Sequence, residues 1–341
     1  MDSVAVIGDQ PLAVPLPAGT RLPIARYRFT FRMQDNLRLP QFAGSLLRGQ
    51  FGAALRRTAC LTGAATCKGC LLLATCPYPE IFETPPPAEH RLQRFSQVPN
   101  PYVIEPPRFG TRAVPAGQSL VFEMVLVGRA LGRLALIVHA FQRALGHGLG
   151  RERARGALES LAVQNGEGWI DIWDAARGRI EEHDAQLAIP DLLPSQSATL
   201  RIETPLRLQH QGHPLPLARL TPRVLVTNLL RRATLLLELH NGNPPLVDDA
   251  RATALARHAE TLADERRLRW QDWSRYSSRQ KHEMTLGGAD GEWTLHGDLA
   301  PVLPLLWLGQ WLHAGKNASM GMGGYTLSLD GAPPPPSRDC S

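Results

Sequence analysis

The segment Pro304–Leu327, PLLWLGQWLHAGKNASMGMGGYTL, joins an apolar run to a glycine-rich loop and then to a second apolar run. The first run has the length and spacing of a helix, predicted over residues 301–313. Residues 325–329 alternate as in a strand. The chain is therefore expected to leave a helix, make several tight turns and enter a sheet.

The glycine-rich loop has a composition suited to phosphate. Glycines lack Cβ atoms, so their backbone N–H groups can approach an anion closely, and Lys316, Asn317 and Ser319 add a charge and hydrogen-bond donors. The alternative is that the glycines only permit tight turns against the sheet. The loop has no Gly-Lys-Ser/Thr ending and precedes a strand, so neither a P-loop nor a dinucleotide fingerprint is present. A nucleotide-cofactor enzyme is disfavoured.

Outward from this segment, both halves of the chain show the order βαββαβ. The first half has predicted strands or extended segments at 24–32, 102–106, 120–127 and 157–163, and helices at 42–59 and 131–145. The second half has predicted strands at 198–209, 267–277, 292–299 and 325–329, and helices at 222–241, 248–266 and 301–313; Thr221 and Pro222 begin the first of these helices and Gly242 ends it. Gly150 and Arg151 precede Gly315 and Lys316 by 165 residues, which is weak evidence for duplication.

The predicted fold class is α+β, with two tandem ferredoxin-like (βαββαβ) domains. We expect an N-terminal domain over 20–185 with a Cys-rich insertion at 60–90, a C-terminal domain over 195–330 that carries the glycine-rich loop, and a disordered tail over 331–341. The boundary falls in the proline-containing stretch 181–197.

Composition and charge set the broad class. The 341 residues are 43% hydrophobic and 20% charged, as in an ordinary globular protein. The net charge of +6 comes almost entirely from arginine, which fits a polyanionic partner or a GC-rich genome. There is no apolar run long enough to cross a membrane and no basic-then-apolar N-terminus, so we expect a cytoplasmic protein. Esterase, metalloprotease and EF-hand signatures are absent.

Four of the five cysteines lie close together in the sequence, in the pattern C-x6-C-x2-C-x5-C. Four thiolates within 17 residues can surround one tetrahedral Zn²⁺, and four protein ligands would make that site structural. An iron–sulfur cluster and free buried thiols are the alternatives. The predicted ligands are Cys60, Cys67, Cys70 and Cys76, and Lys68 lies at the tip of this loop.

Three blocks resemble the CRISPR-associated endoribonucleases that process precursor CRISPR RNA, within the repeat-associated (RAMP) superfamily. They are PLLWLGQWLHAGKNASMGMGGYTL at 304–327, RYSSRQKHEMTLGGADGEWTLHGDLAP at 275–301 and FAGSLLRGQFGAALRRTACLTGAATCKGC at 42–70. The resemblance implies two ferredoxin-like domains holding repeat RNA in a positive cleft. It also implies cleavage without a catalytic metal, in which the 2′-OH attacks the adjacent phosphate to leave a 2′,3′-cyclic phosphate and a 5′-OH.

This chemistry needs a base, an acid and groups that hold the phosphorane charge. The family's usual histidine near the first helix is missing, because no histidine precedes His90. The catalytic candidates are therefore reassigned, with His282 first, to His282, Tyr276, Lys281 and Arg48. His147 is a weaker candidate. The predicted RNA-binding residues are Arg56, Arg57, Arg151, Arg275, Ser277, Arg279, Gly315, Lys316, Asn317, Ser319, Gly321 and Gly323.

The leading hypothesis is an endoribonuclease that stays bound to the 3′ handle of its product within an effector complex, in contact with the backbone subunits. The main alternative is a non-catalytic RNA-binding RAMP subunit. A zinc-stabilised protein-interaction module without an RNA role is the third possibility.

Overall fold

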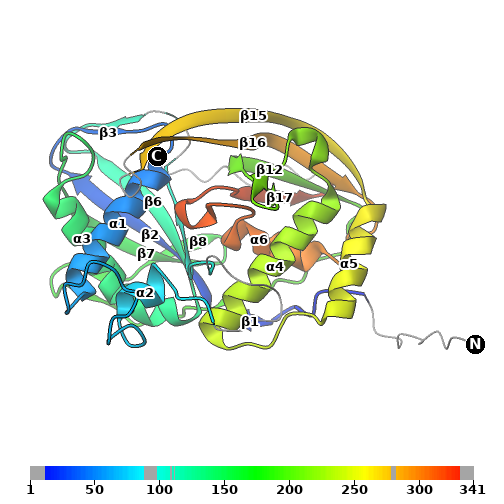
Figure 1. Ribbon diagram of the computed structural model, residues 1–341, viewed down its shortest axis with the longest axis horizontal. Helices are drawn as coiled ribbons and strands as arrows, with labels where there is room; N and C mark the ends of the chain where they lie inside the picture. Colours follow the sequence, from blue (N-terminus) through cyan, green and yellow to red (C-terminus); the bar gives the residue numbers. More distant parts are fainter. Residues whose placement is uncertain (1–11, 88–97, 108–109, 111, 278–281, 331–341) are drawn as a thin grey trace, which may run out of the picture.

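Two antiparallel sheets stand side by side in the computed structural model (Figure 1), which describes residues 12–87, 98–107, 110, 112–277 and 282–330. The first sheet has the strand order β4-β6-β2-β7-β8 and the second has the order β15-β16-β12-β17. The first sheet belongs to the N-terminal half of the chain and the second to the C-terminal half. In the first sheet β2 lies between β6 and β7, and in the second β12 lies between β16 and β17, so the first main strand of each half lies between the third and the last. This is the order of a ferredoxin-like βαββαβ unit, with β8 added at one edge of the first sheet.

The first sheet is covered on one face by helices. Its strands are β2 (Ile24–Met33), β4 (Tyr102–Glu105), β6 (Ser119–Val127), β7 (Gly156–Asn165) and β8 (Gly168–Asp171), and its helices are α1 (Ala43–Ala59), α2 (Pro77–Ile81) and α3 (Leu134–His147). On β2, alternation sends Tyr27, Phe29 and Phe31 into the core under the helices. Arg26 and Arg28 consequently point to the opposite face, which is turned towards the second sheet.

The second sheet has a similar layout. Its strands are β12 (Ser197–Leu206), β15 (Ala263–Ser277), β16 (His282–His296) and β17 (Tyr325–Leu329), with helices α4 (Pro222–Asn241), α5 (Asp249–Thr261) and α6 (Leu303–Leu312). The Thr221 hydroxyl accepts a hydrogen bond from the N–H of Val224, and Gly242 ends α4 in the left-handed conformation with φ of 72°. The predicted bounds of α4 are confirmed.

Short pairs and turns complete the fold. They are β1 (Arg21–Leu22) with β11 (Leu187–Ala188), β3 (Leu37–Leu39) with β5 (Arg112–Val114), β9 (Trp173–Asp174) with β10 (Arg179–Ile180), β13 (Gln209–His210) with β14 (His213–Pro214), and the 3₁₀ turns η1 (Gly128–Arg133), η2 (Leu217–Arg219) and η3 (Ala318–Met320). Among the described helices, none has the length and apolar character needed to cross a bilayer.

The hairpin β15–β16 is longer than predicted. Its strands pair from Ala263 opposite His296 to Ser277 opposite His282, whereas a helix was expected to run to residue 266 and the return strand to begin only at 292. In Figure 1 the hairpin arches from the α5 side towards the first half. The prediction was wrong because the charged run after Thr261 resembles a helix surface, and because Gly287, Gly288 and Gly291 resemble a loop.

The two halves share a hydrophobic core. Ile24, Val103, Val125 and Val127 of the first sheet pack in the same cluster as the core residues of α4 and α6. A second contact is made by α4, where a Cβ added at Gly128 would lie 2.2 Å from the carbonyl oxygen of His240. The two halves are therefore joined by shared apolar packing.

Candidate functional site

A cavity of about 810 Å³ lies between the facing surfaces of the two sheets. One wall is formed by β12, β15 and β16, and the other by β4 and β6. His313 and Gly324, at the two ends of the glycine-rich loop, close it on one side. The charged residues lining it are Glu105, Glu123, Arg201, Glu203, Arg267, Arg269, Asp290 and Glu292.

Arginine–carboxylate pairs cover much of this cavity wall. Arg269 Nε lies 2.8 Å from Asp290 Oδ1, and Arg201 Nη2 lies 3.6 Å from Glu292 Oε1. Glu105 and Glu123 pair with Arg26 and Arg28. Carboxylates therefore lie beside the arginines of this cavity, and the positive cleft that the family resemblance implies stays a prediction.

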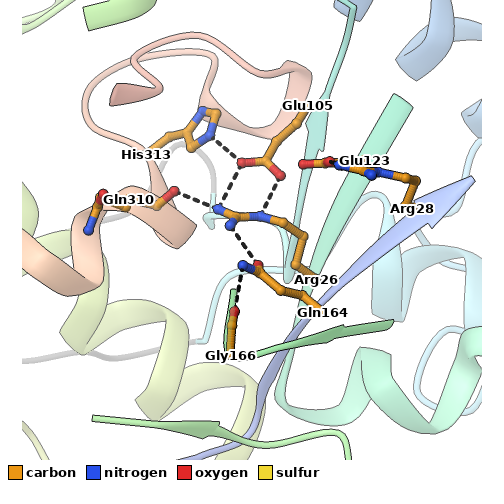
Figure 2. A network of polar contacts seen from close by, with 8 residues as sticks. All are labelled: Arg26, Arg28, Glu105, Glu123, Gln164, Gly166, Gln310 and His313. Carbon is orange, nitrogen blue, oxygen red and sulfur yellow. Dashed lines mark hydrogen bonds and ion pairs between the residues drawn. The ribbon is translucent and has the colours of Figure 1, made fainter. Parts of the chain in front are cut away.

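A buried network joins the two halves at the edge of the cavity (Figure 2). Arg26 on β2 donates from Nε to Glu105 Oε2 at 2.7 Å and from Nη2 to Glu105 Oε1 at 3.1 Å. Arg26 also donates to Gln164 Oε1 at 2.9 Å and to the carbonyl oxygen of Gln310 at 2.8 Å. His313 Nε2 lies 3.0 Å from Glu105 Oε1. Both Arg26 and Glu105 are 5% exposed, so the network is shielded from water.

His313 has an acceptor beside each ring nitrogen. Nδ1 lies 3.2 Å from the carbonyl oxygen of Met322, and Nε2 faces the carboxylate of Glu105. A carbonyl oxygen only accepts hydrogen bonds, and so does an ionised carboxylate. Both ring nitrogens of His313 are therefore engaged by the protein itself.

The backbone at His313 is strained. Its φ of 58° and ψ of 160° lie in a region that is otherwise nearly confined to glycine. Such a conformation costs about 1–3 kcal/mol for a residue with a side chain. The surrounding contacts hold the residue there.

Arg28 and Glu123 form a second ion pair on the same sheet face. Arg28 Nη2 lies 2.6 Å from Glu123 Oε1, and its guanidinium carbon lies 4.0 Å from the ring centroid of Trp169 on β8. Glu123 is 2% exposed. This pair lies within the first half and has no hydrogen bond to the glycine-rich loop among its described contacts.

The glycine-rich loop uses its backbone N–H groups inside the protein. Gly315 donates to Asn228 Oδ1, Gly321 to the carbonyl oxygen of Ala318, and Gly323 to that of Pro205. An added Cβ at Gly321 would lie 2.4 Å from the carbonyl oxygen of Ile104, and one at Gly323 would lie 1.8 Å from that of Ala314. These three glycines therefore permit close packing, and in this structure their N–H groups are not available for the predicted phosphate contact.

Other loop residues keep polar groups near the surface. Lys316 is exposed, and Asn317 and Ser319 are partly exposed. Their predicted contact with RNA stays a prediction.

A small apolar junction brings three distant segments together. Phe42 precedes α1, Trp273 and Leu286 come from the hairpin, and Met320 and Met322 come from the glycine-rich loop. An added Cβ at Gly44 would lie 1.9 Å from the carbonyl oxygen of Met320, so α1 begins directly against the loop. The three blocks that carry the family resemblance therefore meet in space.

The leading catalytic candidates lie beyond this junction, at the end of the hairpin. Tyr276 is paired with Glu283 and Ser277 with His282 along the strands. The side chains of Arg275, Tyr276, Ser277 and His282 lie outside the described part of the structure, as do residues Arg279 and Lys281 entirely. Their predicted roles stay predictions.

Arg48 lies within the first half. Its guanidinium carbon is 4.4 Å from the ring centroid of Phe82 on the side of α1 that faces α2. Burial raises the pKa of Tyr102, and a hydrogen bond with Arg48 acts in the opposite direction. Arg48 is not among the residues that line the inter-sheet cavity, and its catalytic role stays a prediction.

The remaining predicted RNA-binding arginines are dispersed. Arg56 Nη2 donates to the carbonyl oxygens of Ala64 and Ala65, which holds the cysteine loop against α1. Arg57 and Arg151 are exposed. His147, the weaker catalytic candidate, is also exposed and contacts the carbonyl oxygen of Arg143 through Nδ1.

The four clustered cysteines surround one small pocket after α1 and are free thiols. A hydrogen bond from Thr62 lowers the pKa of Cys60, whereas burial raises the pKa of Cys67. Within the described residues, no three histidine, cysteine, aspartate or glutamate side chains are arranged to hold a metal ion. The predicted zinc therefore stays a prediction.

The sequence alone did not point to Arg26, Glu105 and His313 as a group. They are far apart in the chain, and only the pairing of β2 with β6, the pairing of β4 with β6 and the docking of α6 bring them together. An alternating strand with arginines on one face was the available signal at Arg26. Nothing local marked Glu105 as its partner.

Comparisons with known proteins agree with the observed fold. Residues 22–185 match a family model described as an N-terminal domain, and residues 200–325 match the model of the CRISPR-associated endoribonuclease Cas6. No curated protein matches the chain.

Several solved structures are similar over most of the chain. A Cas6 product complex has a TM-score of 0.54 and 16% identity, covering 89% of this chain and all of that one. Thermus thermophilus Cas6 has a TM-score of 0.50 and 15% identity, covering 91% and 99%. A partial Cas6-RT-Cas1–Cas2 complex has a TM-score of 0.51 and 14% identity, covering 93% of this chain and 47% of that one. At these identities the likeness shows the fold.

The observed fold and the match over residues 200–325 agree with the resemblance that the sequence indicated. The similarity to the CRISPR-associated endoribonuclease Cas6 family lies in residues 200–325. The glycine-rich loop and the whole β15–β16 hairpin lie within that matched segment.

Proposed function

We propose that this chain is an endoribonuclease that cleaves repeat RNA in CRISPR precursor transcripts. The match of residues 200–325 to the Cas6 family is the observation that carries the proposal. The meeting of α1, the hairpin and the glycine-rich loop supports it, because this contact lies close to the turn end of the hairpin, which carries Tyr276 and His282. We further propose that the product stays bound through its 3′ handle and that effector-complex subunits are partners.

The proposed reaction is an internal transesterification that needs no catalytic metal. The ribose 2′-oxygen loses its proton to a base and forms a bond to the adjacent phosphorus, and the bond from phosphorus to the 5′-oxygen breaks. An acid protonates the leaving oxygen, which gives a 2′,3′-cyclic phosphate and a 5′-OH. Arginine or lysine side chains would stabilise the extra negative charge on the phosphorane.

We propose His282 as the acid or base, with Tyr276 and Lys281 beside it. His282→Ala should slow cleavage by about 100-fold or more, the usual contribution of a general acid or base. His296→Ala is the matched control, since His296 is an exposed histidine at the other end of the same strand. An unchanged rate in His282→Ala would exclude this assignment.

A direct test uses purified protein and its cognate repeat RNA in EDTA, with a second substrate carrying 2′-deoxyribose at the cut site. Cleavage of the first and survival of the second are expected, with a cyclic phosphate on the upstream product. A melting curve in EDTA shows whether the cysteine loop stays folded during the assay. Cleavage of the deoxy substrate would overturn the proposed mechanism.

A non-catalytic RNA-binding subunit is the second candidate. It is favoured by the absence of any histidine before His90 and by the engagement of both ring nitrogens of His313 beside the cavity. Tight, salt-sensitive binding of repeat RNA without products would support this alternative.

A further inference from the structure

We infer that His313 and Glu105 are positioning residues for RNA cleavage, because together they fix the glycine-rich loop to the first sheet. The inference builds on the proposed function and assigns it two residues outside the predicted catalytic set. Neither residue is expected to touch RNA, since His313 is 1% exposed and Glu105 is 5% exposed.

The first step is the link across the two halves. Glu105 ends β4 in the first half, and His313 follows α6 in the second. The imidazole contacts Glu105 through Nε2 and the carbonyl oxygen of Met322 through Nδ1. One ring therefore connects the first sheet to both ends of the loop, as Figure 2 shows for the contact with Glu105.

The second step is the close packing next to this link. Gly321 lies against the carbonyl oxygen of Ile104 and the ring of Pro106, the residues on either side of Glu105. The loop and the end of β4 are thus in backbone contact as well as in hydrogen-bond contact. A substitution at Glu105 therefore alters the end of β4 against which the loop packs.

The third step is the strained backbone at His313. Glycine would adopt the observed φ and ψ without strain, yet a histidine occupies the position. A residue that only ended α6 would not need this side chain. The two bonds of the imidazole give a physical reason for keeping it despite the strain.

The fourth step connects the loop to the proposed catalytic region. Met320 and Met322 of the loop pack with Phe42 before α1 and with Trp273 and Leu286 of the hairpin. A loop released from β4 would shift these contacts and with them the turn end of the hairpin, which carries His282. Small displacements of reacting groups reduce rates steeply, by up to about 100-fold per ångström.

The test compares His313→Gly and Glu105→Gln with Glu123→Gln in the full-length protein. Glycine removes the imidazole and relieves the backbone strain, so this variant remains informative if Glu105→Gln does not fold. Glu123 is the matched control because it is equally buried, pairs with Arg28 on the same sheet face and lines the same cavity. Single-turnover cleavage at saturating RNA, RNA affinity, melting temperature and backbone amide exchange are measured.

We expect cleavage at saturating RNA to fall by about 10- to 100-fold in His313→Gly and Glu105→Gln while RNA affinity changes by less than about threefold. Amide exchange of residues 315–324 should become about tenfold faster or more. Glu123→Gln should leave both the rate and loop exchange close to those of the unchanged protein.

Wild-type cleavage rates and wild-type loop exchange in folded His313→Gly and Glu105→Gln would overturn the inference. Equal losses in Glu123→Gln would also overturn it, because they would assign the effect to general destabilisation of the sheet. If the unchanged protein cleaves no RNA, the proposed function fails, and the exchange measurement alone decides whether the pair fixes the loop.

Discussion

The rings of Phe42 and Trp273 pack with their centroids 5.6 Å apart and their planes inclined by 51°. Phe42 immediately precedes α1 in the first half, whereas Trp273 lies on the long hairpin of the second half. This contact secures the hairpin to the first half near the end that carries Tyr276 and His282.

Removal of this contact should release the hairpin. Trp273→Ala is expected to lower the free energy of unfolding by about 3 kcal/mol, as for other buried aromatic truncations, and Trp273→Phe should cost less because a ring remains. Denaturant titration measures both. Trp270→Ala is the control on the same strand, since Trp270 is only half-buried and bonds to Asp272; an equal loss there would contradict the assigned role of Trp273.

The packing of the glycine-rich loop on β4 predicts a large effect of a single methyl group. Gly321→Ala should destabilise the protein by about 2–4 kcal/mol, because φ is +94° and the new Cβ would overlap the Ile104 carbonyl oxygen. Gly212→Ala separates the two causes: φ is +84° there and nothing lies within 4 Å of the new Cβ. Its expected cost is about 1 kcal/mol. Equal costs at the two sites in denaturant titrations would show that the loop is not packed as described.

His240 predicts a loss of stability in mild acid. Burial lowers its pKa from 6.5 to about 4, and its Nε2 lies 2.7 Å from the carbonyl oxygen of Pro99. In the unfolded chain His240 is therefore protonated below about pH 6.5, whereas in the folded protein it is protonated only below about pH 4. The stabilisation is complete above pH 6.5 and is lost as the pH falls to 4, by about 3 kcal/mol in all.

The measurement is the free energy of unfolding between about pH 7 and about pH 4. His240→Gln provides the comparison, because glutamine can donate to the Pro99 carbonyl oxygen but does not titrate. Its stability should depend less on pH over this range. The same pH dependence in both proteins would remove His240 as the cause.

The predicted structural zinc at the four clustered cysteines can be tested by metal analysis. We expect about one zinc ion per chain in protein purified without chelator, and its loss in Cys67→Ser and Cys70→Ser. Cys340→Ser is the control, because Cys340 lies far from the four clustered cysteines in the sequence. Elemental analysis measures the metal, and visible absorption would reveal an iron–sulfur cluster instead. Metal-free, fully stable protein would leave the four thiols without a metal role.

The sequence was most informative where local signals agree. Thr221, Pro222 and Gly242 correctly predicted both ends of α4, because capping and proline geometry act within a few residues. It was least informative at the hairpin, where charged residues on an exposed strand have no helical or strand signature of their own. There the pairing of β15 with β16 determines the conformation, and that pairing is a tertiary interaction.

The α+β class and the twofold βαββαβ order followed from the sequence by itself, because hydrophobic periodicity and helix caps are local properties. The same sequence also carried the three blocks of the family resemblance. Only the tertiary structure decided that the loop glycines pack against β4, and that Arg26, Glu105 and His313 form one network between the sheets. The physical reason is that these contacts join residues from distant segments, so no local pattern constrains which side chains become buried together.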